Sequence, residues 1–341
     1  MEKLPIKQIA KPIDDDGLAS RGSRSATTSF GSADLLLLLT TLIWGSNYVV
    51  IKYALEDILP INFTALRFAI ASIVMLALMR ASGRNLKLEP GDFWKLFALG
   101  IVSNVLYQVL FMEGMKRSRA GNASLILATV PIFTALIGRL RRSEFFTPRA
   151  VIGLILAFGG LALIVSAART GHEAGDSLVG HGLLLLGATC WATYTAATRR
   201  FVQTYGAIKA TTVIMLCGTP VLLLVSMPGL IEQNWRAIRL VSWAGVLFSA
   251  FLAIALSYVI WNYGIHKIGS TRTSIYSNVT PAATLIVAWA ALGEVPLPGQ
   301  IAGAVIILVG VYLVRRGVTH PASESSEDEE IEEVSLVPGR G

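Results

Sequence analysis

Long apolar segments separated by short polar ones dominate the sequence between residues 34 and 316. Most of these segments are long enough to cross about 30 Å of hydrocarbon as a helix. Charged residues gather at the joints between them and at both ends of the chain. The pattern predicts an all-α membrane protein with ten transmembrane helices, at approximately 34–52, 62–80, 93–115, 121–140, 148–167, 179–199, 207–227, 241–265, 271–293 and 297–315.

An internal repeat divides the chain into two halves. The stretch at 120–165 aligns without a gap on the stretch that begins 150 positions later. Repetition of this kind indicates one structural unit that occurs twice. Since five spans per unit is an odd number, the second copy enters the membrane in the opposite orientation, as in many secondary transporters. We therefore expect two inverted five-helix repeats, at 34–167 and 179–316. The repeat pairs Pro131 with Pro281, Glu144 with Glu294, Gly153 with Gly303 and Gly160 with Gly310.

Composition and charge agree with a membrane protein and predict its orientation. Hydrophobic residues make up 53% of the chain and charged residues 15%, against about 45–50% and about 25% in soluble domains. Lysine and arginine at helix ends favour a cytoplasmic location for both termini, in an inner or plasma membrane. The loop containing Lys116, Arg117 and Arg119 is the exception. The polar tail at 1–33 and the acidic tail at 317–341 are predicted to be disordered.

Several classes of function are disfavoured by missing motifs. The sequence has no Gly-x-x-x-x-Gly-Lys-Ser/Thr phosphate loop, which argues against ATP-driven transport by this chain alone. Its four histidines lack metal-ligand spacing, and no Gly-x-Ser-x-Gly nucleophile motif occurs. We expect neither an enzyme nor a protein with a metal or cofactor, and the net charge of +7 is explained by membrane orientation rather than by nucleic acid.

Aromatic and amide side chains share helix faces in the first, third, sixth and eighth spans. Spacing of i, i+3 and i+4 places such residues on one side of a helix. Facing each other across a cavity, they would give an amphipathic organic solute flat contact area and hydrogen bonds. The alternatives are an interfacial aromatic belt and amide bonds between helices. The candidate cavity residues are Trp44, Asn47, Tyr48, Asn104, Tyr107, Gln108, Phe111, Trp191, Tyr194, Tyr258, Trp261 and Asn262.

Ionisable residues within the spans are rarer, because a charge in lipid is costly. Arg67, inside the second span, is a candidate to bind a solute carboxylate, or to pair with Glu113 or a helix C-terminus. Glu113 is the candidate for coupling transport to protons. Glu144 and Glu294 lie at equivalent hairpin turns and are predicted to be structural, each capping the helix that follows.

Proline and glycine recur at equivalent places in the two copies. Pro131 and Pro281 fall at mid-span, where proline removes a backbone hydrogen bond and kinks a helix. They are candidates for hinges or a cavity wall, or for static kinks. Small-residue faces that permit close helix packing are predicted at Gly153, Gly159, Gly160, Gly303 and Gly310.

Several short motifs occur in the spans and in the second hairpin: Trp44-Gly45-Ser46-Asn47, Leu66-Arg67-Phe68, Pro281, Leu292-Gly293-Glu294, Gln300, Gly303 and Gly310-Val311. Through these motifs, residues 35–316 resemble the EamA family of the drug/metabolite transporter superfamily. The first copy departs from the family pattern at 141–143 and 149–150. The resemblance implies transport of amino acids, their derivatives or other metabolites, often outward.

The pattern and the resemblance together favour a secondary-active transporter that exports a small, amino-acid-like metabolite by alternating access. Its partners would be the solute, the lipid bilayer and protons as the candidate coupling ion. A nucleotide-sugar or phosphate-ester carrier would need several basic residues in the cavity, and only Arg67 is available. A membrane scaffold without transport activity would leave the repeated prolines and aromatic faces unexplained.

Overall fold

The computed structural model describes residues 31–140, 145–170 and 177–319. Nearly all of the two expected tails lies outside these residues, as does Glu144. The described chain is helical apart from turns and a pair of two-residue strands, β1 (Phe145–Phe146) and β2 (Val318–Thr319). These strands pair antiparallel, with Phe145 opposite Thr319.

The helices of the two halves follow one another in a similar order. The first half comprises α1 (Ser32–Ala54), α2 (Pro60–Ala81), α3 (Asp92–Gly100), the π-helix η2 (Ile101–Leu106), α4 (Tyr107–Lys116), α5 (Ala120–Leu127), α6 (Val130–Leu140) and α7 (Pro148–Thr170). The second comprises α8 (Leu178–Glu232), the short η3 (Trp235–Ala237), α9 (Leu240–Phe248), the π-helix η4 (Ser249–Leu256), α10 (Ser257–Ile268), α11 (Ser270–Ile275), the 3-10 turn η5 (Tyr276–Val279), α12 (Thr280–Leu292) and α13 (Pro298–Gly317). Helix α8 runs through the place where the first half has the two separate helices α1 and α2.

Seven helical stretches among the described residues are long and apolar enough to cross a membrane. Two shorter apolar helices, Pro148–Ile164 and Pro298–Val314, accompany them. The 55-residue α8 is interrupted at Gly206, whose φ of +76° is a conformation that glycine adopts without steric cost. Large apolar side chains such as Leu140 and Leu240 point outward, as expected for surfaces that face lipid.

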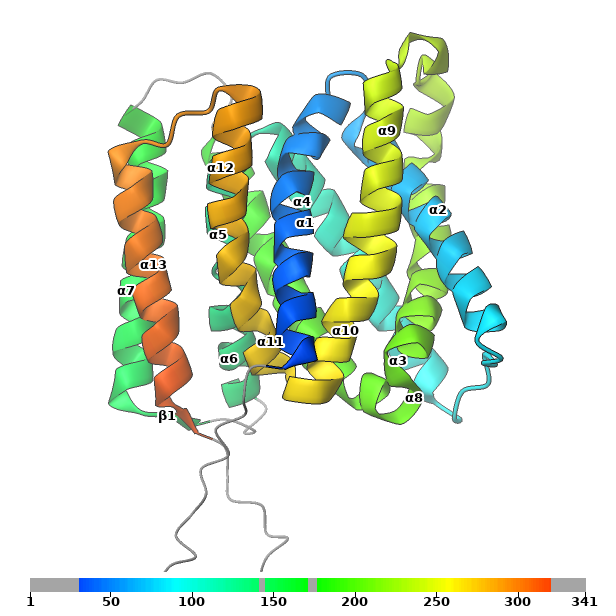
Figure 1. Cartoon of the computed structure of the whole chain (residues 1–341), viewed down its shortest axis with the longest axis horizontal. Coiled ribbons are helices and arrows are strands. Elements are labelled where there is room, and N and C mark those ends of the chain that lie inside the picture. Colours follow the sequence, from blue (N-terminus) through cyan, green and yellow to red (C-terminus); the bar gives the residue numbers. More distant parts are fainter. Residues whose placement is uncertain (1–30, 141–144, 171–176, 320–341) are drawn as a thin grey trace, which may run out of the picture.

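The two halves are intertwined rather than separate. Helix α1 packs against α9, α10 and α12 of the second half, and α8 packs against α2, α3 and α4 of the first. Figure 1 shows that α1 begins, and α13 ends, at the same end of the bundle. The core of the bundle is therefore formed by helices of both halves.

Helices α7 and α13 lie against each other through glycines. A Cβ atom on Gly153 would lie 2.5 Å from the carbonyl oxygen of Gly310, and one on Gly160 would lie 2.7 Å from that of Gly303. The pairing is crossed, since Gly153 is equivalent to Gly303 in the repeat and contacts Gly310 instead. Gly159 was predicted on the same packed face, but a Cβ there would meet nothing within 4 Å.

The repeated prolines begin new helices instead of kinking continuous ones. Helix α5 ends at Leu127, and Pro131 is the second residue of α6. Likewise, η5 separates α11 from α12, and Pro281 is the second residue of α12. In the first turn of a helix the N–H that proline lacks would have no intrahelical partner. The predicted mid-span kinks are therefore replaced by two equivalent helix breaks.

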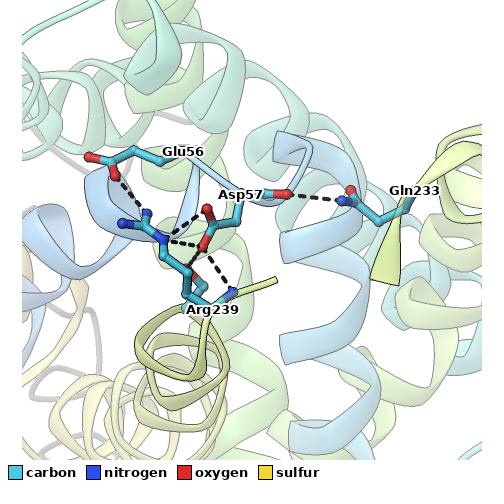
Figure 2. Close-up of polar contacts among 5 residues, drawn as sticks. Glu56, Asp57, Gln233 and Arg239 are labelled. Atoms are coloured by element: carbon cyan, nitrogen blue, oxygen red, sulfur yellow. Dashed lines mark hydrogen bonds and ion pairs between the residues drawn. The ribbon is translucent and has the colours of Figure 1, made fainter. Parts of the chain in front are cut away.

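A cluster of polar side chains connects the α1–α2 turn to the start of α9. Arg239 donates from Nε to Asp57 Oδ2 at 2.9 Å and from Nη2 to Glu56 Oε2 at 2.6 Å, as Figure 2 shows. Ser242 Oγ also donates to Asp57. Gln233 Nε2 donates to the backbone oxygen of Asp57 at 2.9 Å, which brings the end of α8 into the same cluster.

A second polar cluster occupies the equivalent place in the other half. Asp92, at the start of α3, accepts a hydrogen bond from Tyr205 Oη at 2.8 Å, just before the break in α8. Lys95 and Arg200 form ion pairs with Asp92 at 3.3 and 3.5 Å. Asp92 and Ser242 are 150 positions apart. The start of α3 thus contacts the break in α8, and the start of α9 contacts the turn between α1 and α2.

Replacing Asp57 by asparagine is expected to lower thermal stability at pH 7. The hydrogen bonds from Arg239 and Ser242 hold the pKa of Asp57 below its usual value. A carboxyl with a lowered folded-state pKa stabilises the fold above its unfolded pKa, near 4, and loses that contribution as the pH falls through the folded-state value. The difference in melting temperature between wild type and Asp57→Asn should therefore shrink below about pH 4.

The matched control for this substitution is Glu56→Gln. Glu56 contacts the same arginine, but its side chain is 55% exposed against 14% for Asp57. Exposed ion pairs contribute little because solvent screens them. Melting curves of the purified protein in detergent from pH 7 to pH 3 would contradict the assignment if both variants lost equal stability, or if the loss at Asp57 did not depend on pH.

Candidate functional site

A central pocket lies where the two halves meet. About 630 Å³ of empty space lies within it, a volume that includes the open space at its mouth. Helices α1, α2, α4, α5 and α6 contribute from the first half, and α8, η4, α10, η5 and α12 from the second. It is lined by Trp44, Asn47, Tyr48, Arg67, Tyr107, Gln108, Phe111, Ser124, Leu127, Val130, Trp191, Ala253, Ile254, Tyr258, Ser277 and Thr280.

Aromatic rings form a continuous wall around Trp191, whose side chain is 4% exposed. Its ring centroid lies 5.1 Å from that of Tyr107, 5.2 Å from that of Tyr258 and 5.7 Å from that of Trp44. These are ordinary separations for tilted and edge-to-face ring pairs. The wall presents flat, weakly polar surface to whatever occupies the pocket.

Arg67 supplies the positive charge of the pocket lining. It donates from Nη2 to Gln108 Oε1 at 2.6 Å, and Gln108 Nε2 donates in turn to Tyr258 Oη at 3.0 Å. Gln108 and Tyr258 are equivalent residues of the two repeats. One amide therefore joins the buried arginine of the first half to a tyrosine of the second half.

The polar pocket residues of α1 are held by contacts with η4. Trp44 Nε1 donates to the backbone oxygen of Ala253 at 2.8 Å. Asn47 Oδ1 accepts a hydrogen bond from Ser249 Oγ at 2.5 Å. A π-helix widens the turn, and η4 and η2 occur at matching places in the two repeats. Such segments are frequent at functional sites.

Four of the predicted cavity residues lie behind the pocket wall instead of lining it. Asn262 Nδ2 donates to Tyr194 Oη and to Thr211 Oγ1, both at 2.7 Å. Trp261 donates to a threonine of α8 at 3.3 Å, and Asn104 donates to a backbone oxygen of α8 at 3.4 Å. These contacts between helices match the alternative considered for the amides. Hydrogen bonds of this kind join neighbouring helices within a membrane.

The lining residues that sequence reasoning missed cluster at helix breaks and in η4. Leu127 and Val130 flank the break between α5 and α6, and Ser277 and Thr280 flank the equivalent break before Pro281. Leu127 and Ser277 are 150 positions apart, as are Val130 and Thr280. The repeat register, applied to the neighbours of each proline, could have found them. Ser124, Ala253 and Ile254 carried no comparable signal.

Glu113 lies outside the central pocket. It lines a smaller adjoining pocket together with Gln108, which borders both. Its carboxylate accepts a hydrogen bond from Arg117, four residues along the same helix. Its side chain is 34% exposed.

Glu294 caps a different helix from the one predicted. Its carboxylate oxygens accept hydrogen bonds from the backbone N–H groups of Ala120 at 3.2 Å and Gly121 at 3.3 Å, at the start of α5. The start of α13 is capped instead by Gln300, whose Oε1 accepts from Leu297 N at 2.7 Å. The prediction for Glu294 was wrong in its partner because the hairpin turn folds onto the other half. The equivalent prediction for Glu144 falls outside the described residues.

Comparison with known proteins shows both the fold and the family. A protein of known crystal structure superposes with a TM-score of 0.63 at 20% identity, covering 84% of this chain and 98% of that chain. An uncharacterized transporter of Bacillus subtilis, YyaM, is 28% identical over 87% of this chain and 98% of its own length. A probable terminal-alkyne amino-acid exporter of Streptantibioticus cattleyicolor is 26% identical, covering 85% of this chain and 95% of its own.

The family model shows where the likeness lies along the chain. The model of the EamA-like transporter family matches residues 31–166 and again residues 178–316. Together with the apolar helices of sufficient length, this match describes a multi-pass membrane protein whose partners are a small-molecule solute and lipid. The chain therefore belongs to the EamA-like transporter family.

Proposed function

We propose that this protein is a secondary-active transporter that exports a small, amino-acid-like solute by alternating access. The observation that carries the proposal is the central pocket, which both halves line with residues at equivalent positions of the repeat. Gln108 and Tyr258 are one such pair, and Val130 and Thr280 are another. A pocket shared by two similar halves can open to either face by nearly equivalent motions.

The proposal includes ten spans in two inverted five-helix repeats. Counting α8 as two helices on either side of Gly206, and adding the shorter α7 and α13, brings the seven candidate spans of the described residues to ten. The shared end at which α1 begins and α13 ends is consistent with this even number. The excess of lysine and arginine supports a cytoplasmic location for that end, with the protein in the inner or plasma membrane.

The pocket chemistry favours this solute over a phosphate ester. Among the residues that line the pocket, Arg67 is the one permanent cation, whereas several cations are expected around a nucleotide sugar. The relative from Streptantibioticus cattleyicolor is named a probable terminal-alkyne amino-acid exporter, and that name supports both the direction and the class of solute. The pocket itself argues against a scaffold without transport activity.

The direct test is transport by the purified protein in liposomes. We expect it to move amino-acid-like compounds down a gradient, and to concentrate them when a proton gradient is imposed. Liposomes without protein and liposomes containing Trp191→Ala are the controls. Failure to move any compound of a broad amino-acid and metabolite panel would contradict the proposal.

Glu113→Gln is expected to uncouple transport from the pH gradient. Glu113 borders the smaller pocket next to Gln108, so protonation there is adjacent to the amide that joins the two halves. The variant should retain exchange of solute across the membrane but lose most of the accumulation that the pH gradient drives. Accumulation equal to that of wild type would remove Glu113 from the coupling mechanism.

A further inference from the structure

Arg67 is a buried cation without a counter-charge. Its side chain is 2% exposed. Among the described residues, no carboxylate forms an ion pair with Arg67. A buried, unpaired charge is unfavourable, and a charged residue within a membrane span usually has a functional role.

The contacts that Arg67 makes are all with neutral groups. Besides Gln108, NH2 lies 3.6 Å from Met112 Sδ, and the guanidinium carbon lies 5.2 Å from the ring centroid of Phe63 and 5.9 Å from that of Phe68. The Nε–H has no hydrogen-bond partner. These contacts hold the side chain in place but leave both its charge and one donor uncompensated.

A second unsatisfied group borders the same pocket from the other half. The hydroxyl oxygen of Thr280, at the start of α12, is buried and has no hydrogen-bond partner. Arg67 and Thr280 thus bring unused hydrogen-bond donors to one pocket from opposite halves. The remaining polar groups of the lining residues are hydroxyl, amide and indole N–H groups, and no carboxylate is among the lining residues.

We propose that Arg67 binds a carboxylate of the solute, whose flat apolar body lies against the aromatic wall around Trp191. This inference rests on the transport function proposed above and names the class of solute. A planar guanidinium is suited to a carboxylate, because it offers donors in a fixed geometry. A solute amine has only ring faces and neutral oxygens to contact. The carboxylate is therefore the required group, and the amine is dispensable.

Four compounds with the same phenylpropyl body separate these requirements. They are 3-phenylpropionate, L-phenylalanine, the neutral 3-phenylpropionamide and the cationic 3-phenylpropylamine. Binding to the full-length protein in detergent at pH 7 is measured by thermal shift and calorimetry. We expect both carboxylates to bind, and the amide and the amine to bind at least about tenfold more weakly, because neither offers the guanidinium a charged acceptor.

Variants of Arg67 test whether this residue causes the preference. Arg67→Gln should abolish the discrimination between 3-phenylpropionate and 3-phenylpropionamide, whereas Arg67→Lys should retain part of it. Arg80→Gln is the matched control, because Arg80 lies on the same helix with an exposed side chain. A purely structural arginine would change stability without changing the ratio of the two affinities. If Arg67→Gln does not fold, the four-compound comparison on wild type decides.

The outcomes distinguish this inference from the proposed function. If the amide or the amine binds as tightly as the carboxylates and is transported, the carboxylate site is wrong and the transport function stands. If none of the four compounds binds and the liposome panel shows no transport, both are contradicted. Preference for the carboxylates that survives in Arg67→Gln would place the anion site elsewhere.

Discussion

Trp191→Ala is expected to abolish measurable transport and to destabilise the protein strongly. Trp191 contacts the rings of Trp44, Tyr107, Tyr258 and also Tyr194 and Trp261, with centroids between 5.0 and 5.9 Å from its own. Removing a buried tryptophan typically costs about 3–5 kcal/mol. Here the lost ring also leaves a hole in the pocket wall. The transport rate of the protein that still folds should therefore fall as well.

Two further variants separate these contributions. Trp191→Phe keeps a flat ring in the wall and should restore most of the stability but only part of the transport rate. Trp289→Ala is the matched control, since Trp289 on α12 is 61% exposed and faces away from the core. Melting temperature and initial transport rate should both stay near wild type for Trp289→Ala. A Trp191→Ala protein that transports at the wild-type rate would exclude the aromatic wall from solute binding.

Gly153→Ala is expected to produce the second largest effect, a loss of folded protein without any change in the pocket. The added Cβ would lie 2.5 Å from the carbonyl oxygen of Gly310 and 2.7 Å from the backbone nitrogen of Val314. Backbone atoms cannot rotate away as a side chain can, so α7 and α13 must separate. Overpacking of this kind costs about 1–3 kcal/mol, and separation would weaken the rest of the contact between the two helices.

Gly159→Ala provides the control on the same helix. A Cβ at Gly159 meets nothing within 4 Å, and alanine is favoured over glycine in a helix by about 1 kcal/mol. This variant should therefore melt at or slightly above the wild-type temperature. The yield of folded protein is measured by size-exclusion chromatography in detergent, and the melting temperature by a thermal unfolding curve. Equal values of both for Gly153→Ala and Gly159→Ala would mean that the two helices do not approach as closely as described.

The positions of the helices could be read from the sequence, because lipid imposes a simple requirement on each span. Apolar stretches predicted at 62–80 and 93–115 correspond to α2, Pro60–Ala81, and to the continuous helical stretch Asp92–Lys116. The repeat register also placed Gln108 and Tyr258 in corresponding spans. Hydrophobic length and repetition are local properties, so they need no knowledge of neighbouring helices.

The details of the pocket depended on contacts that no local pattern encodes. Tyr194 and Trp261 carry the same aromatic signal as Trp191, but hydrogen bonds with Asn262 and Thr195 hold them behind the wall. The packing of helices from one half against those of the other determines which aromatic residues face the cavity. Sequence periodicity predicts which residues share a face, but it does not show which helix that face meets.

The sequence by itself determined a helical membrane protein, the approximate limits of its apolar segments and the register of its internal sequence repeat, since each follows from hydrophobic length or from repetition. Only the tertiary structure decided that Glu294 caps α5, that Asp57 meets Arg239, and that Arg67 lies beside Gln108 without a carboxylate. Each of these depends on the packing of helices distant in the chain, where side-chain shape and the satisfaction of buried polar groups select the partners.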